Sequence, residues 1–70
     1  MNEYQKKQEF VEKHLEPLIK AADFSVESVV YTSDNGEYVT IRYIQSPNAV
    51  RVCVSGDSLA ALTRDVMKKI

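Results

Sequence analysis

The 70-residue chain has few of the residue types that build metal sites and disulfide frameworks. It contains one cysteine, Cys53, and one histidine, His14. These residues allow no internal disulfide and do not supply the Cys and His ligands of a structural zinc site. We therefore expect no cofactor, no metal and a reducing, cytoplasmic location.

Long apolar runs are lacking as well. No stretch approaches the roughly 20 apolar residues of a membrane-spanning helix, and the chain opens with a charged helical pattern instead of a secretion signal. An excess of charge of one sign is also absent, because nine Lys and Arg residues balance ten Asp and Glu residues. These absences predict no membrane contact and no global attraction to nucleic acid.

The composition is that of an ordinary globular protein, with 44% hydrophobic and 27% charged residues. A chain of this size forms one domain, which buries about 60% of the surface that the unfolded chain exposes. We expect a single domain over residues 1–70, without a large enclosed active-site cavity.

The amino-terminal part shows the period of an amphipathic helix, predicted from Glu3 to Ala22. Pro17 removes a backbone hydrogen bond inside it, so we expect a kink near residues 13–16 or two shorter helices. The outer face carries Glu/Lys pairs four residues apart, such as Glu3 and Lys7, and predicts a solvated surface. The predicted apolar stripe comprises Tyr4, Val11, Leu15, Leu18 and Ala22, with Ile19 at its edge.

Three alternating runs rich in β-branched residues follow and predict strands over residues 25–32, 37–44 and 49–55. Asn35-Gly36 indicates a two-residue type I′ turn, and residues 45–48 indicate a four-residue turn. These short connections predict an antiparallel meander, in which Val30 pairs with Ile41 and Ile41 with Val52. The resulting core face comprises Val26, Val30, Val39, Ile41, Tyr43, Val50, Val52 and Val54, with Ser28 and Thr32 between them.

A second helix is predicted after the capping sequence Ser55-Gly56-Asp57. Its apolar stripe comprises Leu59, Leu62, Val66 and Ile70. The predicted fold is therefore α+β in the order α-β-β-β-α, a three-stranded antiparallel meander sheet with two helices packed on one face.

The string Gly56-Asp57-Ser58-Leu59 resembles the nucleophile block of the GDSL esterase and lipase family. In that family the serine works with a downstream Asp-x-x-His pair, whereas His14 lies upstream. A nucleophilic serine needs a positioned base, so we interpret the string as a helix cap. We expect no enzyme activity, because the sequence positions no pair of titratable groups for it.

The sheet face opposite the predicted core is the most informative surface. Tyrosine and arginine, which are enriched at the centres of protein interfaces, share it with aliphatic residues. We therefore expect this face to bind a protein partner, or a second copy of the chain in a homodimer. The predicted partner-binding residues are Val29, Tyr31, Tyr38, Thr40, Arg42, Ile44, Arg51 and Cys53.

The alternative function is nucleic-acid binding, with Tyr31 and Tyr38 stacking on bases while Arg42 and Arg51 contact phosphates. The element order and the length are similar to those of the double-stranded-RNA-binding domain. That family reads RNA with a lysine-rich start of its second helix, where this chain has residues 55–58, Ser-Gly-Asp-Ser. The resemblance therefore concerns the architecture alone.

Overall fold

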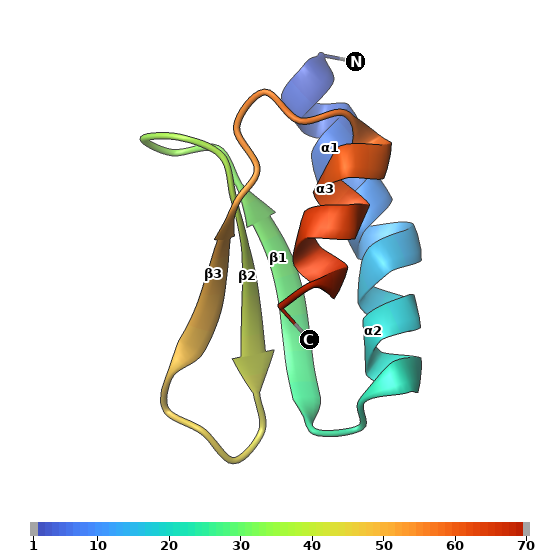
Figure 1. Ribbon diagram of the computed structural model, residues 1–70, viewed down its shortest axis with the longest axis vertical. Coiled ribbons are helices and arrows are strands. Elements are labelled where there is room, and N and C mark those ends of the chain that lie inside the picture. Colours follow the sequence, from blue (N-terminus) through green and yellow to red (C-terminus); the bar gives the residue numbers. More distant parts are fainter. Residues whose placement is uncertain (1, 70) are drawn as a thin grey trace.

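The computed structural model describes residues 2–69 and shows the predicted α+β architecture (Figure 1). Its three-stranded antiparallel sheet has the order β1 (Val26–Thr32), β2 (Tyr38–Tyr43) and β3 (Ala49–Cys53). The helices lie together on one side of this sheet. The predicted element order, the antiparallel meander and the placement of the helices are thus confirmed.

The first helix contains an irregular turn beside Pro17. It runs as α1 (Glu3–Phe10), the π-helical turn η1 (Val11–Leu15) and α2 (Glu16–Ala22). In a regular α-helix the proline ring would clash with the carbonyl group four residues earlier. The wider turn, in which the Glu16 N–H donates to the Val11 carbonyl oxygen, provides the irregularity expected from the proline.

The helix face that meets the sheet differs from the predicted stripe. Its buried residues are Lys7, Val11, Leu15 and Ile19, each four residues from the next. The predicted core positions Tyr4, Leu18 and Ala22 are exposed. The wide turn keeps residues at this spacing in line, which moves Ile19 from the edge of the stripe to its centre.

β1 pairs with β2 one residue away from the predicted register, so Val29 faces Ile41. The loop between these strands is formed by residues 33–37 instead of a two-residue turn. Asn35 (φ 54°) and Gly36 (φ 112°) both adopt the left-handed conformation within it. An odd number of loop residues turns every β1 side chain to the other face.

The core therefore receives a different set of β1 residues. Val29 and Tyr31 are buried, while Val30 is 43% exposed, the reverse of the prediction. A β-bulge between Val26 and Ser28 brings Val26 back to the core side.

The second hairpin preserves the predicted facing, although its register differs. Ile41 pairs with Val50 and not with Val52, a shift of two residues. A shift of two leaves each side chain on its predicted face. Val39, Ile41, Val52 and Val54 are accordingly buried, as predicted.

α3 (Leu59–Met67) closes the core from the same side as the first helix. The Ser58 Oγ atom accepts from the Ala61 N–H at 3.2 Å, which confirms that the string Gly56-Asp57-Ser58-Leu59 caps a helix. The capping residue is Ser58 and lies one residue after the predicted capping sequence Ser55-Gly56-Asp57. Leu62 and Val66 are buried as predicted, whereas Leu59 is partly exposed. Ile70 of the predicted stripe lies outside the described residues.

Candidate interaction face of the sheet

The face of the sheet opposite the helices is built from three cross-strand rows of side chains. The observed register places Tyr38, Thr40 and Arg42 of β2 in the middle of these rows. Their neighbours come from β1 on one side and β3 on the other. This set, termed the open face, comprises Ser28, Val30, Thr32, Tyr38, Thr40, Arg42, Ala49, Arg51 and Cys53.

The structure changes the membership of the predicted face. The predicted residues that lie on the open face are Tyr38, Thr40, Arg42, Arg51 and Cys53. Their role in partner binding stays a prediction.

The placement of Val29 and Tyr31 on this face was wrong, because the odd loop turns both into the core. Ile44 is not on the face either, since β2 ends at Tyr43; it lies in the following turn and is 61% exposed. Val30 takes the place on the open face that was predicted for Val29. Two consecutive residues with positive φ occur in hairpin loops of several lengths. The pair Asn35-Gly36 alone therefore did not show that Val30, and not Val29, is exposed.

Tyr38 and Arg51 contact each other on the open face. The Arg51 guanidinium carbon lies 4.5 Å from the centroid of the Tyr38 ring, a cation–π contact between diagonal neighbours on β2 and β3. The ring also lies against Gly36, where an added Cβ atom would be 3.1 Å from the Tyr38 Cε2 atom. Both contacts restrict the tyrosine before any partner binds.

The open face is basic. Its nine paired residues include Arg42 and Arg51 and no acidic residue. Two acidic residues lie at its ends: the exposed Glu27 in the β-bulge of β1, and Asp34, which lines a hollow with Tyr38 and Arg51. The balance of charge also changes along the chain: residues 1–37 contain eight acidic and four basic side chains, whereas residues 38–70 contain two acidic and five basic ones. A chain that is nearly neutral as a whole therefore presents a positively charged sheet surface.

A separate cluster of titratable side chains lies around Glu37, on the helix side of the sheet. Its Oε1 atom accepts from the Lys7 Nζ atom and from the Tyr31 hydroxyl, each at 2.6 Å. Its Oε2 atom accepts from the Gly56 N–H at 3.3 Å. The hydrogen bond from Lys7, followed by that from Tyr31, lowers the pKa of Glu37.

The prediction that the helix face carrying Lys7 is solvated was wrong at this residue. This lysine is only 3% exposed, and its hydrogen bond to Glu37 raises its pKa. Its ion pair with Glu3, at 3.6 Å, is the i,i+4 contact that made it resemble a surface residue in the sequence. Its partner Glu37 lies 30 residues away, so no local sequence pattern indicated that Lys7 is buried.

The cluster around Glu37 has the features of a structural tie. Burial, and next the hydrogen bond to Glu37, raise the pKa of Tyr31, which keeps its hydroxyl protonated as a donor. The donors come from the first helix, from β1 and from the connection between β3 and α3. The carboxylate thus joins three segments that are distant in sequence.

Phe24 and Ile44 form an exposed apolar pair at one end of the molecule, of which Phe24 was missed in the sequence. Phe24 is 87% exposed in the connection between α2 and β1. The Asp23 Oδ1 atom accepts from the N–H and hydroxyl of Ser25, at 3.0 and 2.6 Å, and this turn has Phe24 at its tip. The Ile44 N–H donates to the Ser25 carbonyl oxygen at 2.8 Å, so the turn after β2 lies beside it (Figure 1).

The two residues that often signal chemistry have modest surroundings. Cys53 is an exposed free thiol on the open face, and His14 packs against the Phe10 ring with centroids 5.5 Å apart. Within residues 2–69, no group of three or more His, Cys, Asp and Glu residues is arranged to hold a metal ion. The helices of this part of the chain are all too short or too polar to cross a membrane.

Comparisons of the chain with protein-family models, with curated proteins and with solved structures found no significant match. Function is therefore inferred from the side chains and backbone of the sheet.

Proposed function

We propose that the chain is a non-catalytic protein-interaction module that binds a partner through the open face. The observation that carries this proposal is the Tyr38–Arg51 pair, in cation–π contact at 4.5 Å on a face away from the helices. Tyrosine and arginine contribute a large share of the binding energy in protein interfaces. Because their contact already restricts both side chains, less conformational entropy is lost on binding.

The charge of the open face indicates what the partner contributes. Arg42 and Arg51 can each take a carboxylate in a bidentate arrangement. Val30 adds an exposed aliphatic contact between these polar groups, and Thr32 and Thr40 add hydroxyl groups. The surface therefore suits a protein partner that presents acidic side chains around a small apolar centre.

A homodimer formed by packing two open faces together is the less favourable form of this proposal. Such an isologous interface would bring Arg42 and Arg51 of both copies into one contact region. None of the nine paired residues of that face is a carboxylate that could pair with them, and Glu27 and Asp34 lie only at its ends. Because desolvated charges without partners are costly, a partner of different sequence is favoured.

Nucleic-acid binding has less support than protein binding. That alternative relied on Tyr31 and Tyr38 as stacking platforms. Tyr31 is buried in the core, and the Arg51 guanidinium covers one face of the Tyr38 ring. Two arginines without a free aromatic platform make a weak single-strand surface.

A charge-reversal comparison tests the proposal. The wild-type chain is used to capture proteins from an extract of its native cells, and each captured protein is purified for calorimetric titration. We expect Arg42→Glu to weaken the specific complex at least about tenfold, which corresponds to roughly 1.4 kcal/mol. Lys13→Glu is the matched control, because it makes the same charge change on the exposed surface of the first helix.

Two results would contradict the proposal. One is a partner that binds the Arg42→Glu and Lys13→Glu variants equally well. The other is salt-dependent binding of oligonucleotides that is lost in Arg42→Glu, with no protein recovered.

A further inference from the structure

We propose that the outer edge of β3 captures an extended, acidic segment of a partner protein as an additional strand of the sheet. This inference goes beyond the proposed function, because it concerns the edge of the sheet instead of its open face. It also specifies the conformation and the charge of the bound segment.

The hydrogen-bond pattern shows which backbone groups of β3 face outward. The Val54 N–H donates to the Glu37 carbonyl oxygen at 2.9 Å, which fixes the phase of the ladder between β2 and β3. Because the direction of these groups alternates along an antiparallel strand, Val50 and Val52 direct theirs toward β2. Arg51 and Cys53 direct theirs away from β2, and β3 is the last strand of the described sheet.

At the opposite edge of the sheet, a side chain of the helix layer occupies one outward donor of β1. The Glu16 carboxylate of α2 accepts from the Val29 N–H of β1 at 2.9 Å. A side chain of the first helix thus occupies an outward donor of β1, as sheet edges commonly require. β3 contains neither lysine nor proline between Ala49 and Cys53 to discourage the addition of another strand.

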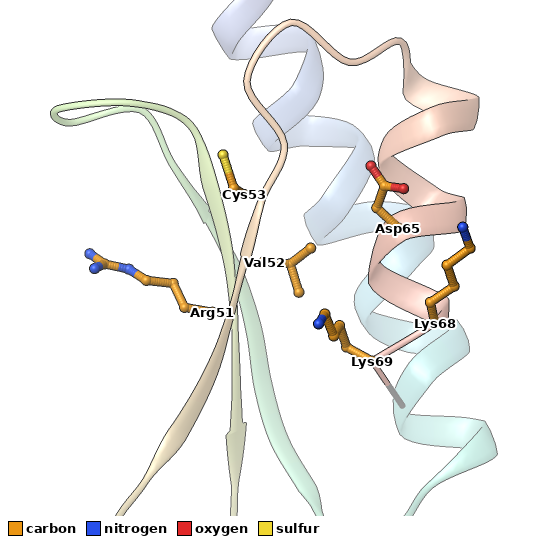
Figure 2. A pocket seen from close by; sticks show the side chains of 6 residues that line it. All are labelled: Arg51, Val52, Cys53, Asp65, Lys68 and Lys69. Carbon is orange, nitrogen blue, oxygen red and sulfur yellow. The ribbon is translucent and has the colours of Figure 1, made fainter.

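A hollow beside β3 offers room for the added strand (Figure 2). It lies between this strand and the end of α3. Val52 and Lys69 point into the space between the two elements, whereas Arg51 extends from the other side of the sheet. A segment added to the edge would place its side chains alternately toward α3 and toward Arg51. The residues that line the hollow are Arg51, Val52, Cys53, Asp65, Lys68 and Lys69.

The charge of this lining specifies the occupant. It has three basic side chains and one acidic side chain, Asp65. Carboxylates on either side of an added strand would meet Arg51 on one side and, on the other, Lys69, with Lys68 farther away along α3. A second copy that added its own β3 would instead bring the same basic residues close to these, and like charges on neighbouring strands repel. Backbone hydrogen bonds and charge complementarity therefore both favour an extended acidic segment.

Amide hydrogen exchange, followed by nitrogen-15 NMR, measures the predicted contact directly. The probe is an acetylated and amidated Val-Glu-Glu-Val-Glu-Glu peptide, about six residues long to match the strand, which presents carboxylates on both of its sides. We expect the Arg51 and Cys53 amides to exchange rapidly in the free protein and slowly with the probe, while the Val50 and Val52 amides are protected in both. The control peptide has lysine in place of glutamate and is expected to give no protection.

Two variants separate the parts of the contact. Lys68→Glu combined with Lys69→Glu leaves the strand unchanged and is expected to weaken probe binding at least about tenfold. Cys53→Pro removes one outward backbone donor, and edge strands tolerate proline, so this variant is also expected to weaken probe binding. If Cys53→Pro fails to fold, the lysine variant alone decides. Lys13→Glu combined with Lys20→Glu makes the same charge change on the first helix and should leave probe binding unchanged.

Three outcomes would overturn the inference. They are no protection at saturating probe, equal binding of the lysine peptide, and protection that rises with protein concentration without the probe, which would identify a second copy as the occupant. Arg42→Glu keeps this test distinct from that of the proposed function. It alters the open face away from the edge of β3, and we expect it to leave the probe-induced protection of Arg51 and Cys53 intact.

Discussion

Glu37 connects segments that are far apart in the sequence, so single substitutions around it test the fold. Lys7→Met removes the cation that donates to its carboxylate at 2.6 Å. We expect a loss of about 2 kcal/mol in the free energy of unfolding, less than for a fully buried pair, because the Glu37 side chain keeps 14% of its surface exposed. Urea unfolding measures this loss. Lys6→Met, at an exposed neighbouring position, should change stability by less than about 0.5 kcal/mol, and equal effects would contradict the assignment.

The lowered pKa of Glu37 predicts a loss of stability in acid. Its ionised form is favoured in the folded chain by the hydrogen bonds from Lys7 and Tyr31. This contribution is present above the ordinary pKa of 4.5 and is lost as the pH falls through the lowered folded value. Wild type should therefore lose more stability than Glu37→Gln on acidification below pH 4.5, as measured by thermal unfolding. Parallel curves would contradict this account.

For Asp57 we expect stability to depend on pH in the opposite direction. Its Oδ2 atom is buried and has no hydrogen-bond partner within the described residues, and neighbouring Asp65, followed by desolvation, raises its pKa. The folded chain therefore favours the neutral acid, and ionisation opposes folding as the pH rises above 3.8. Asp57→Asn should raise the unfolding temperature at neutral pH, and this gain should shrink as the pH falls below the raised folded pKa and vanish below the ordinary value of 3.8. A loss at neutral pH would contradict the prediction.

At the scale of the elements, adjacent valines in β1 test the register. Val29 is fully buried and Val30 is 43% exposed. Val29→Ala should cost about 2 kcal/mol, because it removes methyl groups from a packed core, whereas Val30→Ala should cost less than about 0.5 kcal/mol. Denaturant unfolding of both variants measures the difference. The reverse order would indicate that the Asn35-Gly36 segment forms a two-residue turn.

The sequence was sufficient for the helices and strands but not for the facing of β1. Hydrophobic period and capping residues are local properties, which is why the order of elements and the Ser58 cap could be predicted. The parity of the loop around Asn35 depends on how the whole hairpin packs, and a single residue reverses the strand. The burial of Lys7 likewise depends on Glu37, a partner 30 residues away.

Only part of the open face was predicted, because the facing of each strand also depends on the register of its hairpin. Arg51 and Cys53 of β3 were placed correctly beside Tyr38, Thr40 and Arg42 of β2, because the second hairpin has an even shift, which conserves the facing of β3 relative to β2. Tyr31 was placed there by the wrong register and is in fact a core residue. The Phe24 turn and the outer edge of β3 depend on hydrogen bonds between segments, which periodicity does not report.

At the scale of the whole molecule, the basic residues are concentrated in one part of the fold. The charged residues from β2 onward are predominantly basic, and this part of the chain supplies the centre of the open face, the edge strand and the end of α3. An acidic partner would be attracted to this side of the chain, and its association rate should fall with added salt. Arg51 belongs both to the open face and to the edge of β3, so one partner segment can contact both.

The solution mass, measured by light scattering over a wide concentration range, tests the central claim most directly. That claim is that the open face is left free in the isolated chain and binds a protein of different sequence. The predicted result is the mass of one chain, 8.0 kDa, at every concentration. A stable particle of twice this mass, dissociated by Arg42→Glu but not by Lys13→Glu, would show that the open face binds a second copy and would contradict the account.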